Sequence, residues 1–369
     1  MSETKPHIVR CTVASGKGLQ MICHDHKATM TCRRRLCFGL TAILAAFGSL
    51  AFGNMPASAQ TKVTFGTDWL AEAEHGGFYQ ALAMGFYRNH GLDVTIRMGG
   101  PGVNSEQLVA AGITDFQLSS GGFGALNVVA QDIPVVAVAA YFQKDPQVLI
   151  AHPGAGNDTL AAMKGKPIMV SAGARSGYWL FLKAQFGFSD TQIRPYNYSS
   201  APFLADKTAI QQGFVSSEPY QIERLSGQKP VVHLLADSGF ANYSTVIMAT
   251  RKQVEARPHI VRAFIEASTE GWYSYLYGDP APGDRLIRQA NRDMPQDVLD
   301  NVRATMKHYG IVDSGDSLTL GIGAMTETRW RGFFETMARA GLYRADLPWQ
   351  RAFVLDFVNQ GYGMEMKPK

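Results

Sequence analysis

The chain has 369 residues, of which 18% are charged and 46% are hydrophobic, and its formal net charge is +4. Seven of its 35 basic and two of its 31 acidic residues precede position 60, so the remaining 310 residues carry 28 basic and 29 acidic side chains. This near-neutral remainder shows no clustered Lys and Arg, which argues against a nucleic-acid partner. It is long enough for two domains.

The first 59 residues have the order of a secretory leader. Three consecutive arginines at 33–35 precede an apolar run at 36–52, and Ala-Ser-Ala at 57–59 forms a small-residue cleavage signal. The run is shorter than the roughly twenty residues that a membrane span needs. We therefore predict a cleaved signal peptide over 1–59, general secretion and a periplasmic protein. A start at Met30 would give the leader an ordinary length.

All four cysteines of the chain precede the predicted cleavage point. Cys23, His24, His26 and Cys32 lie close together, but their spacing matches no zinc pattern and their segment is expected to be removed. The sequence therefore predicts no metal site there, and a mature chain without cysteine.

From Lys62 onward, short β-rich runs alternate with amphipathic segments of helical length, which predicts an α/β protein with parallel sheets. The first unit is expected to contain strands at 63–69, 94–98, 116–119 and 135–141 and helices at 77–90 and 103–111. The second is expected to contain strands at 168–171, 193–197, near Phe214, 231–235 and 244–250, with helices at 177–186 and from Pro219. Helices at 253–277, 296–308 and 326–340 are expected to follow.

Two sheet units followed by a helical return are typical of a chain that crosses twice between two lobes. We expect the first lobe to comprise 60–146 and 247–369 and the second to comprise 147–246. In such sheets ligands lie beyond the carboxyl ends of strands, where helix N-termini present free N–H groups. The loops after the strands are therefore where ligand-binding residues are expected.

The loop after the first expected strand carries the most specific pattern. Asp68 and Trp69 are followed, after a short spacer, by His75, Gly77, Tyr79 and Ala81. This arrangement resembles the extracytoplasmic solute-binding proteins for thiamine pyrimidine precursors, alkanesulfonates, taurine and nitrate. Members near the pyrimidine branch carry Asp-Trp, a spacer and then His-x-Gly-x-Tyr-x-Ala.

The resemblance continues in order through most of 62–270, with matching segments at 118–122, 164–167, 171–173 and 217–220. It departs in the spacer, where Glu72 and Glu74 replace the expected Pro and Asn, so the motif leaves the ligand open. The resemblance implies a type II periplasmic-binding fold, with two α/β domains joined by two crossing strands and a helical C-terminal portion. It also implies a monomer that hands one small-molecule solute to the permease and ATPase subunits of an ABC importer at the inner membrane.

Candidate ligand contacts in the first lobe lie at strand ends. Trp69 would stack on a flat ring or else pack in the core, and His75 would hydrogen-bond a ring nitrogen or carboxylate, or cap a helix. Ser119 and Ser120 precede glycines that admit close backbone approach, and would offer hydroxyl and N–H groups or cap a helix. Tyr243, just before the second crossing strand, is a further candidate.

In the second lobe, the candidates Ser171, Arg175, Ser176 and Tyr178 line a loop that enters a helix. Arg175 would pair with an anionic solute through its guanidinium, unless it is an ordinary surface arginine. Glu218 precedes Pro219 in a first helical turn, where the helix dipole stabilises a carboxylate whether or not it binds an amino-bearing ring.

Three functions remain as alternatives. The leading one is a binding protein for an aminopyrimidine or similar N-heterocycle, because Trp69, His75 and Glu218 suit a planar basic ring. A sulfonate, taurine, nitrate or other small anion is favoured instead by Arg175 and the serine loops. The third is an enzyme resembling the pyrimidine-precursor synthase, which uses a cysteine motif and pyridoxal phosphate.

The enzyme is the least favoured alternative, because no cysteine follows position 59. The segment Gly-Ala-Arg-Ser-Gly at 173–177 misses the nucleophile-elbow spacing by one residue, and no Gly-Lys-Ser/Thr phosphate loop occurs. We predict no catalytic residue and no cofactor.

Overall fold

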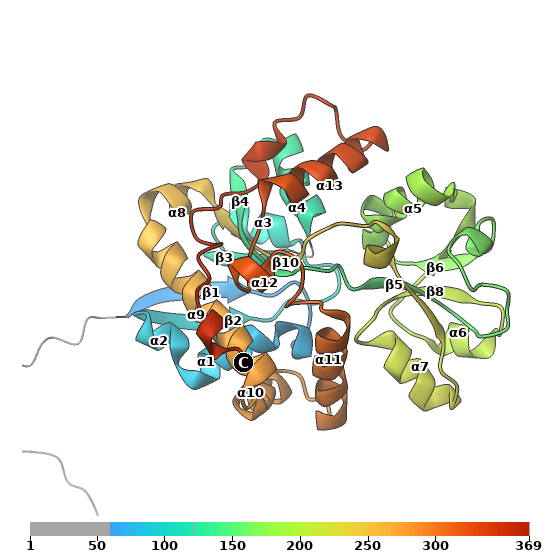
Figure 1. Cartoon of the computed structure of the whole chain (residues 1–369), viewed down its shortest axis with the longest axis horizontal. Coiled ribbons are helices and arrows are strands. Elements are labelled where there is room, and N and C mark those ends of the chain that lie inside the picture. Colours follow the sequence, from blue (N-terminus) through green and yellow to red (C-terminus); the bar gives the residue numbers. More distant parts are fainter. Residues whose placement is uncertain (1–59, 120, 369) are drawn as a thin grey trace, which may run out of the picture. The chain divides into compact units, whose positions relative to one another are not determined.

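The first of two sheets has the strand order β2-β1-β3-β10-β4 in a computed structural model that describes residues 60–119 and 121–368 (Figure 1). Its strands are β1 (Thr61–Gly66), β2 (Leu92–Arg97), β3 (Phe116–Ser119), β4 (Val135–Phe142) and β10 (Ser244–Thr250). The predicted signal peptide, the four cysteines and Ser120 lie outside the described residues, as does the side chain of Ser176.

The second sheet has the order β7-β6-β8-β5-β9. Its strands are β5 (Gln147–Ala151), β6 (Ile168–Val170), β7 (Ile193–Pro195), β8 (Ile210–Phe214) and β9 (Val231–Leu234). The chain leaves the first sheet after β4, enters the second at β5, and returns from β9 to β10. Residues 143–146 and 235–243 are therefore the two crossing segments.

Both sheets are mixed, so the prediction of parallel sheets holds for some strand pairs and not for others. β1 is parallel to β2 and β3, but β10 is antiparallel to both β3 and β4. In the second sheet, β5 is antiparallel to β8 and β9, whereas β6 is parallel to its neighbours. The reversed strands are the first one entered and the one re-entered at a crossing. Strands β4 and β9 end where a crossing segment leaves their sheet, and β10 and β5 begin where one enters, so the entering strand runs opposite to the strands that end at that edge.

Helices surround both sheets (Figure 1). The first half of the chain contributes η1 (Ala73–His75), α1 (Gly76–Met84), α2 (Phe86–Asn89), α3 (Ser105–Ala110) and α4 (Gly122–Ala130). The second sheet is accompanied by η2 (Ala161–Met163), η3 (Gly173–Ser176), α5 (Tyr178–Phe186), η4 (Asp190–Gln192), α6 (Ala201–Ala205), α7 (Glu218–Ser226) and η5 (Leu235–Ser238). The helical C-terminal portion consists of α8 (Arg251–Ala256), α9 (Pro258–Tyr277), α10 (Ala281–Ala290), α11 (Gln296–Tyr309), α12 (Ser317–Leu320), α13 (Glu327–Arg339), η6 (Trp349–Ala352) and η7 (Met364–Met366).

Two helices that the sequence predicts as continuous are broken. Gly85, with φ of 77°, ends α1 and begins α2, because glycine adopts this left-handed conformation at little cost. The expected helix at 253–277 is split before Pro258, which opens α9 instead of continuing α8. None of the helices among residues 60–119 and 121–368 combines the length and apolar character that crossing a membrane requires.

The start of α1 is in close contact with α9. A Cβ on Gly76 would lie 2.0 Å from the ring of Tyr275, and one on Gly77 would lie 2.2 Å from the ring of Trp272. Such distances are too short for any side chain, so only glycine allows this approach. The loop that precedes α1 is thereby fixed against the helical C-terminal portion.

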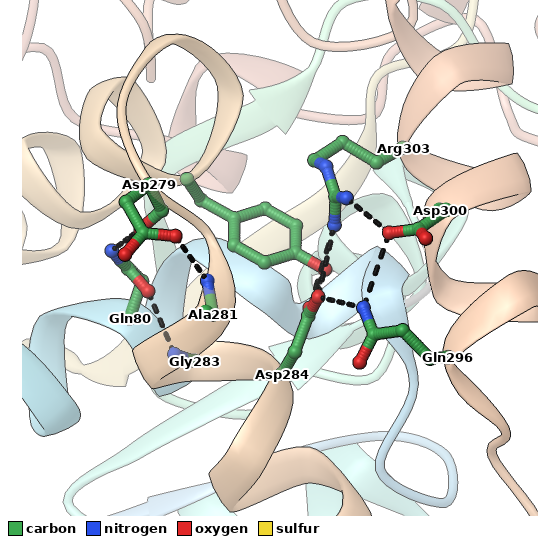
Figure 2. A network of polar contacts seen from close by, with 9 residues as sticks. Gln80, Asp279, Ala281, Gly283, Asp284, Gln296, Asp300 and Arg303 are labelled. Carbon is green, nitrogen blue, oxygen red and sulfur yellow. Dashed lines mark hydrogen bonds and ion pairs between the residues drawn. The ribbon is translucent and has the colours of Figure 1, made fainter.

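A buried ion pair extends this contact to α10 and α11 (Figure 2). Asp284 accepts hydrogen bonds from Tyr275 Oη at 2.8 Å and from Gln296 Nε2 at 2.7 Å, and it pairs with Arg303 at 3.2 Å. At the same N-terminal end of α10, the amide of Gln80 accepts from Gly283 N and donates to Asp279 O, both at 2.8 Å. These bonds connect α1, α9, α10 and α11 to one another. The loop at 67–75 leads directly into α1 and is therefore anchored to this group of helices.

Candidate functional site

The loop at 67–75 follows β1 and is held by several specific bonds. Trp69 O accepts hydrogen bonds from Thr67 Oγ1 at 2.8 Å and from Gly99 N at 3.1 Å. A Cβ on Gly99 would lie 2.3 Å from Thr67 O, so a glycine is needed where the chain after β2 approaches this loop. Asn291 Nδ2, which follows α10, donates to Ala71 O at 2.9 Å. The side chains of the loop are therefore presented from a fixed backbone.

Trp69 contacts the domain that contains the second sheet. Its ring lies against that of Tyr198, which follows β7, with centroids 4.9 Å apart and planes inclined by 48°. Tyr198 in turn lies 5.5 Å from Tyr196, centroid to centroid. Trp69 is half-buried and Tyr198 is exposed, so this pair has surface left to accept a flat ring.

His75 is 3% exposed, and its Nε2 lies 3.2 Å from Asp68 Oδ1. It occupies the N-cap position of α1 but makes no side-chain capping bond there. Its Nδ1 has no hydrogen-bond partner among the described residues. Buried polar atoms are normally satisfied, so the imidazole has capacity for one more polar contact.

Three glutamates gather between the domains. Glu74 is 5% exposed, and its Oε1 accepts from Ser216 Oγ at 2.5 Å. Glu218, the first residue of α7, accepts from Tyr196 Oη at 3.0 Å and from Phe214 N at 2.8 Å. Glu72 belongs to the same group, because the charges of Glu74 and Glu218 both act on it.

Burial is the main reason that these carboxyl groups resist ionisation. It raises the pKa of Glu72 well above its ordinary value, and the nearby charges of Glu74, Asp68 and Glu218 raise it further. Burial likewise raises the pKa of Glu74 and of Glu218. Within the described part of the chain, none of the three glutamates forms an ion pair with Lys or Arg. A cluster of buried carboxyl groups without an ionic partner attracts a cation or a donor of several hydrogen bonds.

The second-domain candidates are only partly brought together. Ser171 N donates to Gln212 Oε1 at 2.6 Å, and Tyr178 Oη donates to the same oxygen at 3.1 Å. Burial raises the pKa of Tyr178 well above its ordinary value, so this side chain acts as a neutral donor. Arg175, by contrast, is exposed on η3.

The serine loop of the first domain is already engaged by the protein. Ser119 is fully buried, and its Oγ donates to Glu106 Oε1 at 2.7 Å. At the start of α4, Gly122 N donates to Asn242 Oδ1 at 2.9 Å and to Tyr243 O at 3.0 Å. An anion at this helix terminus would have to displace these partners.

The side chain of Tyr243 contacts the helical C-terminal portion. Its Oη donates to Asp316 Oδ2 at 2.8 Å and accepts from Thr326 N at 3.0 Å, and the guanidinium of Arg329 lies 4.0 Å from its ring centroid. The bonds of Tyr243 thus lie within the connection between the domains.

Sequence reasoning did not single out Tyr196, Tyr198 or Ser216 as candidate contacts, and it read Glu72 and Glu74 only as departures from a motif. The two tyrosines alternate after β7, which is a weak signal for side chains on one face. Nothing local places Ser216 beside Glu74, 142 residues earlier.

Comparisons with known proteins agree with this architecture. A model of the NMT1/THI5-like family matches residues 72–282. Riboflavin-binding protein RibY of Chloroflexus aurantiacus is 22% identical over 312 residues, which cover 81% of this chain and 87% of RibY.

Among solved structures, the alkanesulfonate-binding protein SsuA from Xanthomonas axonopodis pv. citri, bound to MOPS, has a TM-score of 0.58 and 15% identity, covering 80% of this chain and 98% of SsuA. The desulfurization enzyme DSZB has a TM-score of 0.53 and 12% identity, covering 83% of this chain and 100% of DSZB. At these identities the two structures bear on the fold alone. The family model spans more than half of the 369 residues. The chain therefore belongs to the NMT1/THI5-like family and has the type II periplasmic-binding-protein fold that its sequence predicts.

Proposed function

We propose that the protein is a periplasmic solute-binding protein that delivers one small molecule to the permease and ATPase subunits of an ABC importer. The arrangement that carries the proposal is the set of contacts between the two domains, above all Trp69 with Tyr198 and Glu74 with Ser216. A ligand that touches both domains stabilises the closed state over the open one. RibY and SsuA, which share the fold or sequence pattern, are both named as binding proteins.

The ligand class that we propose is a planar N-heterocycle bearing amino groups or a positive charge, such as an aminopyrimidine. Trp69 and Tyr198 offer aromatic faces, while Glu72, Glu74 and Glu218 offer acceptor oxygens with no Lys or Arg paired to them in the described residues. The free Nδ1 of His75 adds a further polar contact. Riboflavin, the ligand in RibY's name, is also a planar heterocycle, so flavins belong in the same screen.

A sulfonate or other small anion is the second candidate, supported by the fold shared with SsuA. The contacts of this chain favour it less, because Ser119 and Gly122 N already have protein partners and Arg175 is exposed. We propose no catalytic activity, although DSZB shows that an enzyme is known with this fold.

We place the division between the domains at the crossing segments 143–146 and 235–243. The second boundary then lies before β10, a few residues earlier than the expected division at 246 and 247, because β10 pairs along its length with β4.

A thermal-shift screen tests the proposal. The chain from Gln60 onward would be screened against aminopyrimidines, flavins, alkanesulfonates, taurine and nitrate. A ligand present at about a hundred times its Kd adds roughly 2.7 kcal/mol of stability, which is readily visible. Stabilisation by heterocycles alone supports the proposed class. Stabilisation by sulfonates alone overturns the class and keeps the transport function, and stabilisation by none of them argues against both candidates.

A further inference from the structure

One arginine of the C-terminal portion contacts both crossing segments. Arg329, on α13, donates from Nη2 to Gln143 O in the first segment. The same nitrogen donates to Asn242 O in the second segment at 3.1 Å, and Nε donates to Ala241 O at 3.2 Å. A planar guanidinium, with five N–H donors in a fixed fork, can satisfy three carbonyl groups on two segments at once.

The position of Arg329 is itself fixed. Its guanidinium lies 4.0 Å from the ring centroid of Tyr243, a distance at which the cation is attracted to the aromatic face. Tyr243 Oη is held in turn by Asp316, the N-cap residue of α12, and by Thr326, the N-cap residue of α13. The guanidinium is therefore presented to the crossing segments in one orientation.

A second bond joins the crossing segments directly. Asn242 Nδ2 donates to Asp145 Oδ2 at 2.8 Å, and Gln147 N donates to Asp145 Oδ1 at 3.0 Å. Asp145 is 3% exposed, and both of its oxygens have protein partners. Asp145 and Asn242 thus serve the connection between the domains, and Asp145 lies close enough to Arg329 for the guanidinium charge to act on it.

The first crossing segment is also tied to the C-terminal portion by its backbone. Gln143 N and Lys144 N both donate to Ile311 O, at 2.7 Å and 3.1 Å. Gln143 Nε2 donates to Ala324 O at 2.9 Å. The end of this segment nearest the first sheet is therefore held in place, and rotation between the domains falls on the residues beyond it.

From these contacts we infer that Arg329 is a positioning residue that sets the balance between the open and closed states, and with it the ligand affinity, without touching the ligand. The inference rests on the proposed function, since it takes domain closure over a solute as the working motion. Hinges are a few residues that absorb large dihedral changes, and a group that restrains two of them together limits the accessible opening angles. The apparent Kd equals the intrinsic Kd divided by the closed-competent fraction.

Arg329→Lys is the main test variant. It keeps the positive charge but loses the fork that reaches both segments, so the fold is expected to survive, whereas Arg329→Ala would remove the charge and all three bonds. Lys144→Ala is the matched control: Lys144 also links the two segments, through Asp237 at 3.1 Å, but both side chains are solvent-exposed, at 37% and 57%. An exposed ion pair of this kind contributes little to stability.

Opening can be measured without ligand. No cysteine follows position 59, so dyes can be attached to cysteines introduced at the exposed positions Lys207 and Lys252, one in each domain. Energy transfer between the dyes reports the distribution of open and closed molecules. We expect Arg329→Lys to broaden or shift this distribution, whereas Lys144→Ala leaves it unchanged.

Affinity is measured by calorimetric titration with the best ligand from the screen. We expect Arg329→Lys to weaken binding by about tenfold, corresponding to a tenfold smaller competent fraction, and Lys144→Ala to change it by less than about twofold. A wild-type distribution together with a wild-type Kd in Arg329→Lys overturns the inference. If no screened ligand binds the wild type, both proposed ligand classes fail, while the energy-transfer measurement still decides whether Arg329 restrains the hinge.

Discussion

Glu74 and Ser216 form a hydrogen bond between the two domains, with 2.5 Å between Oε1 and Oγ, and both residues are almost fully buried. A short bond to a carboxyl group at a domain contact ties the geometry of the loop at 67–75 to that of β8 and α7. In the proposed site, Glu74 would therefore both contact the ligand and hold the domains together.

Ser216→Ala removes the donor to Glu74 and leaves a buried carboxyl oxygen unsatisfied. We expect the free energy of unfolding to fall by about 1 to 3 kcal/mol and ligand affinity to fall as well. Urea unfolding and calorimetric titration measure the two effects. Ser217→Ala is the matched control, because Ser217 only accepts a 3.4 Å bond from Gln221 near the surface. Equal effects of the two substitutions would contradict a special role for Ser216.

Trp69→Ala and Arg175→Ala separate the two ligand classes. If the solute is a planar heterocycle, loss of the Trp69 ring is expected to weaken binding more than loss of Arg175. The order reverses for a small anion. Each decisive loss is on the order of 1 to 3 kcal/mol, or roughly tenfold to a hundredfold in Kd. Calorimetric titration of both variants measures this, and changes of less than about twofold in both would remove these residues from the site.

The stability of the ligand-free protein is expected to decrease as the pH rises from about 4 to about 7. Burial raises the pKa of Asp145 from 3.8 to about 6, and it also raises the pKa of Glu72, Glu74 and Glu218. The folded state thus holds protons that the unfolded state has released in this window, so the stabilisation present at low pH is lost on deprotonation. For Asp145 alone the loss is on the order of 2 to 3 kcal/mol.

Urea unfolding at several pH values checks this dependence. A carboxyl group with the same pKa in the folded and unfolded states does not change the free energy of unfolding with pH. The sign of the slope of that free energy against pH is therefore the decisive result. Glu74→Gln is expected to flatten the slope, because it removes one of the raised groups. Stability that rises steadily from pH 5 to pH 7 would contradict the assignment. A cationic ligand is expected to bind more tightly as the pH rises through the same window, because it replaces protons.

Asp284→Ala is expected to destabilise the protein by about 1 to 3 kcal/mol, because it removes the acceptor of the buried Tyr275 Oη and leaves Arg303 with only the exposed Asp300 as an ionic partner. Thermal or urea unfolding measures the loss. Asp346→Ala, which breaks the exposed pair with Arg344, serves as the control and is expected to leave the unfolding midpoint unchanged. Similar midpoints for the two variants would show that the network of Figure 2 does not support the fold as described.

The elements with regular patterns were predictable from the sequence, and those decided by distant partners were not. β5 follows Pro146 directly after the first crossing and pairs with β8 and β9, 59 or more positions later, so no local pattern predicted it. α4 was missed because Gly122 and Gly124 lower its intrinsic helix propensity. Its burial against β4 and β10 compensates.

The candidate site likewise has a part that local sequence predicts and a part that depends on distant residues. Trp69 and His75 belong to a motif within a single loop, so their position at the end of β1 could be predicted. The group formed by Glu72, Glu74 and Glu218 could not, because it depends on two loops that come together only when both domains have folded. Sequence spacing carries no information about such a contact.

The place of β10 in the first sheet has a consequence for the order in which the protein folds. β10 lies between β3 and β4, so the middle of that sheet stays empty until residue 250 has been made and delivered, after the whole second domain. The second sheet, by contrast, is contiguous from Gln147 to Leu234. Pairings between distant segments form slowly. The second domain can therefore fold while β3 and β4 still expose the edges that later pair with β10, and a chain interrupted before β10 would be prone to aggregate through these unpaired edges.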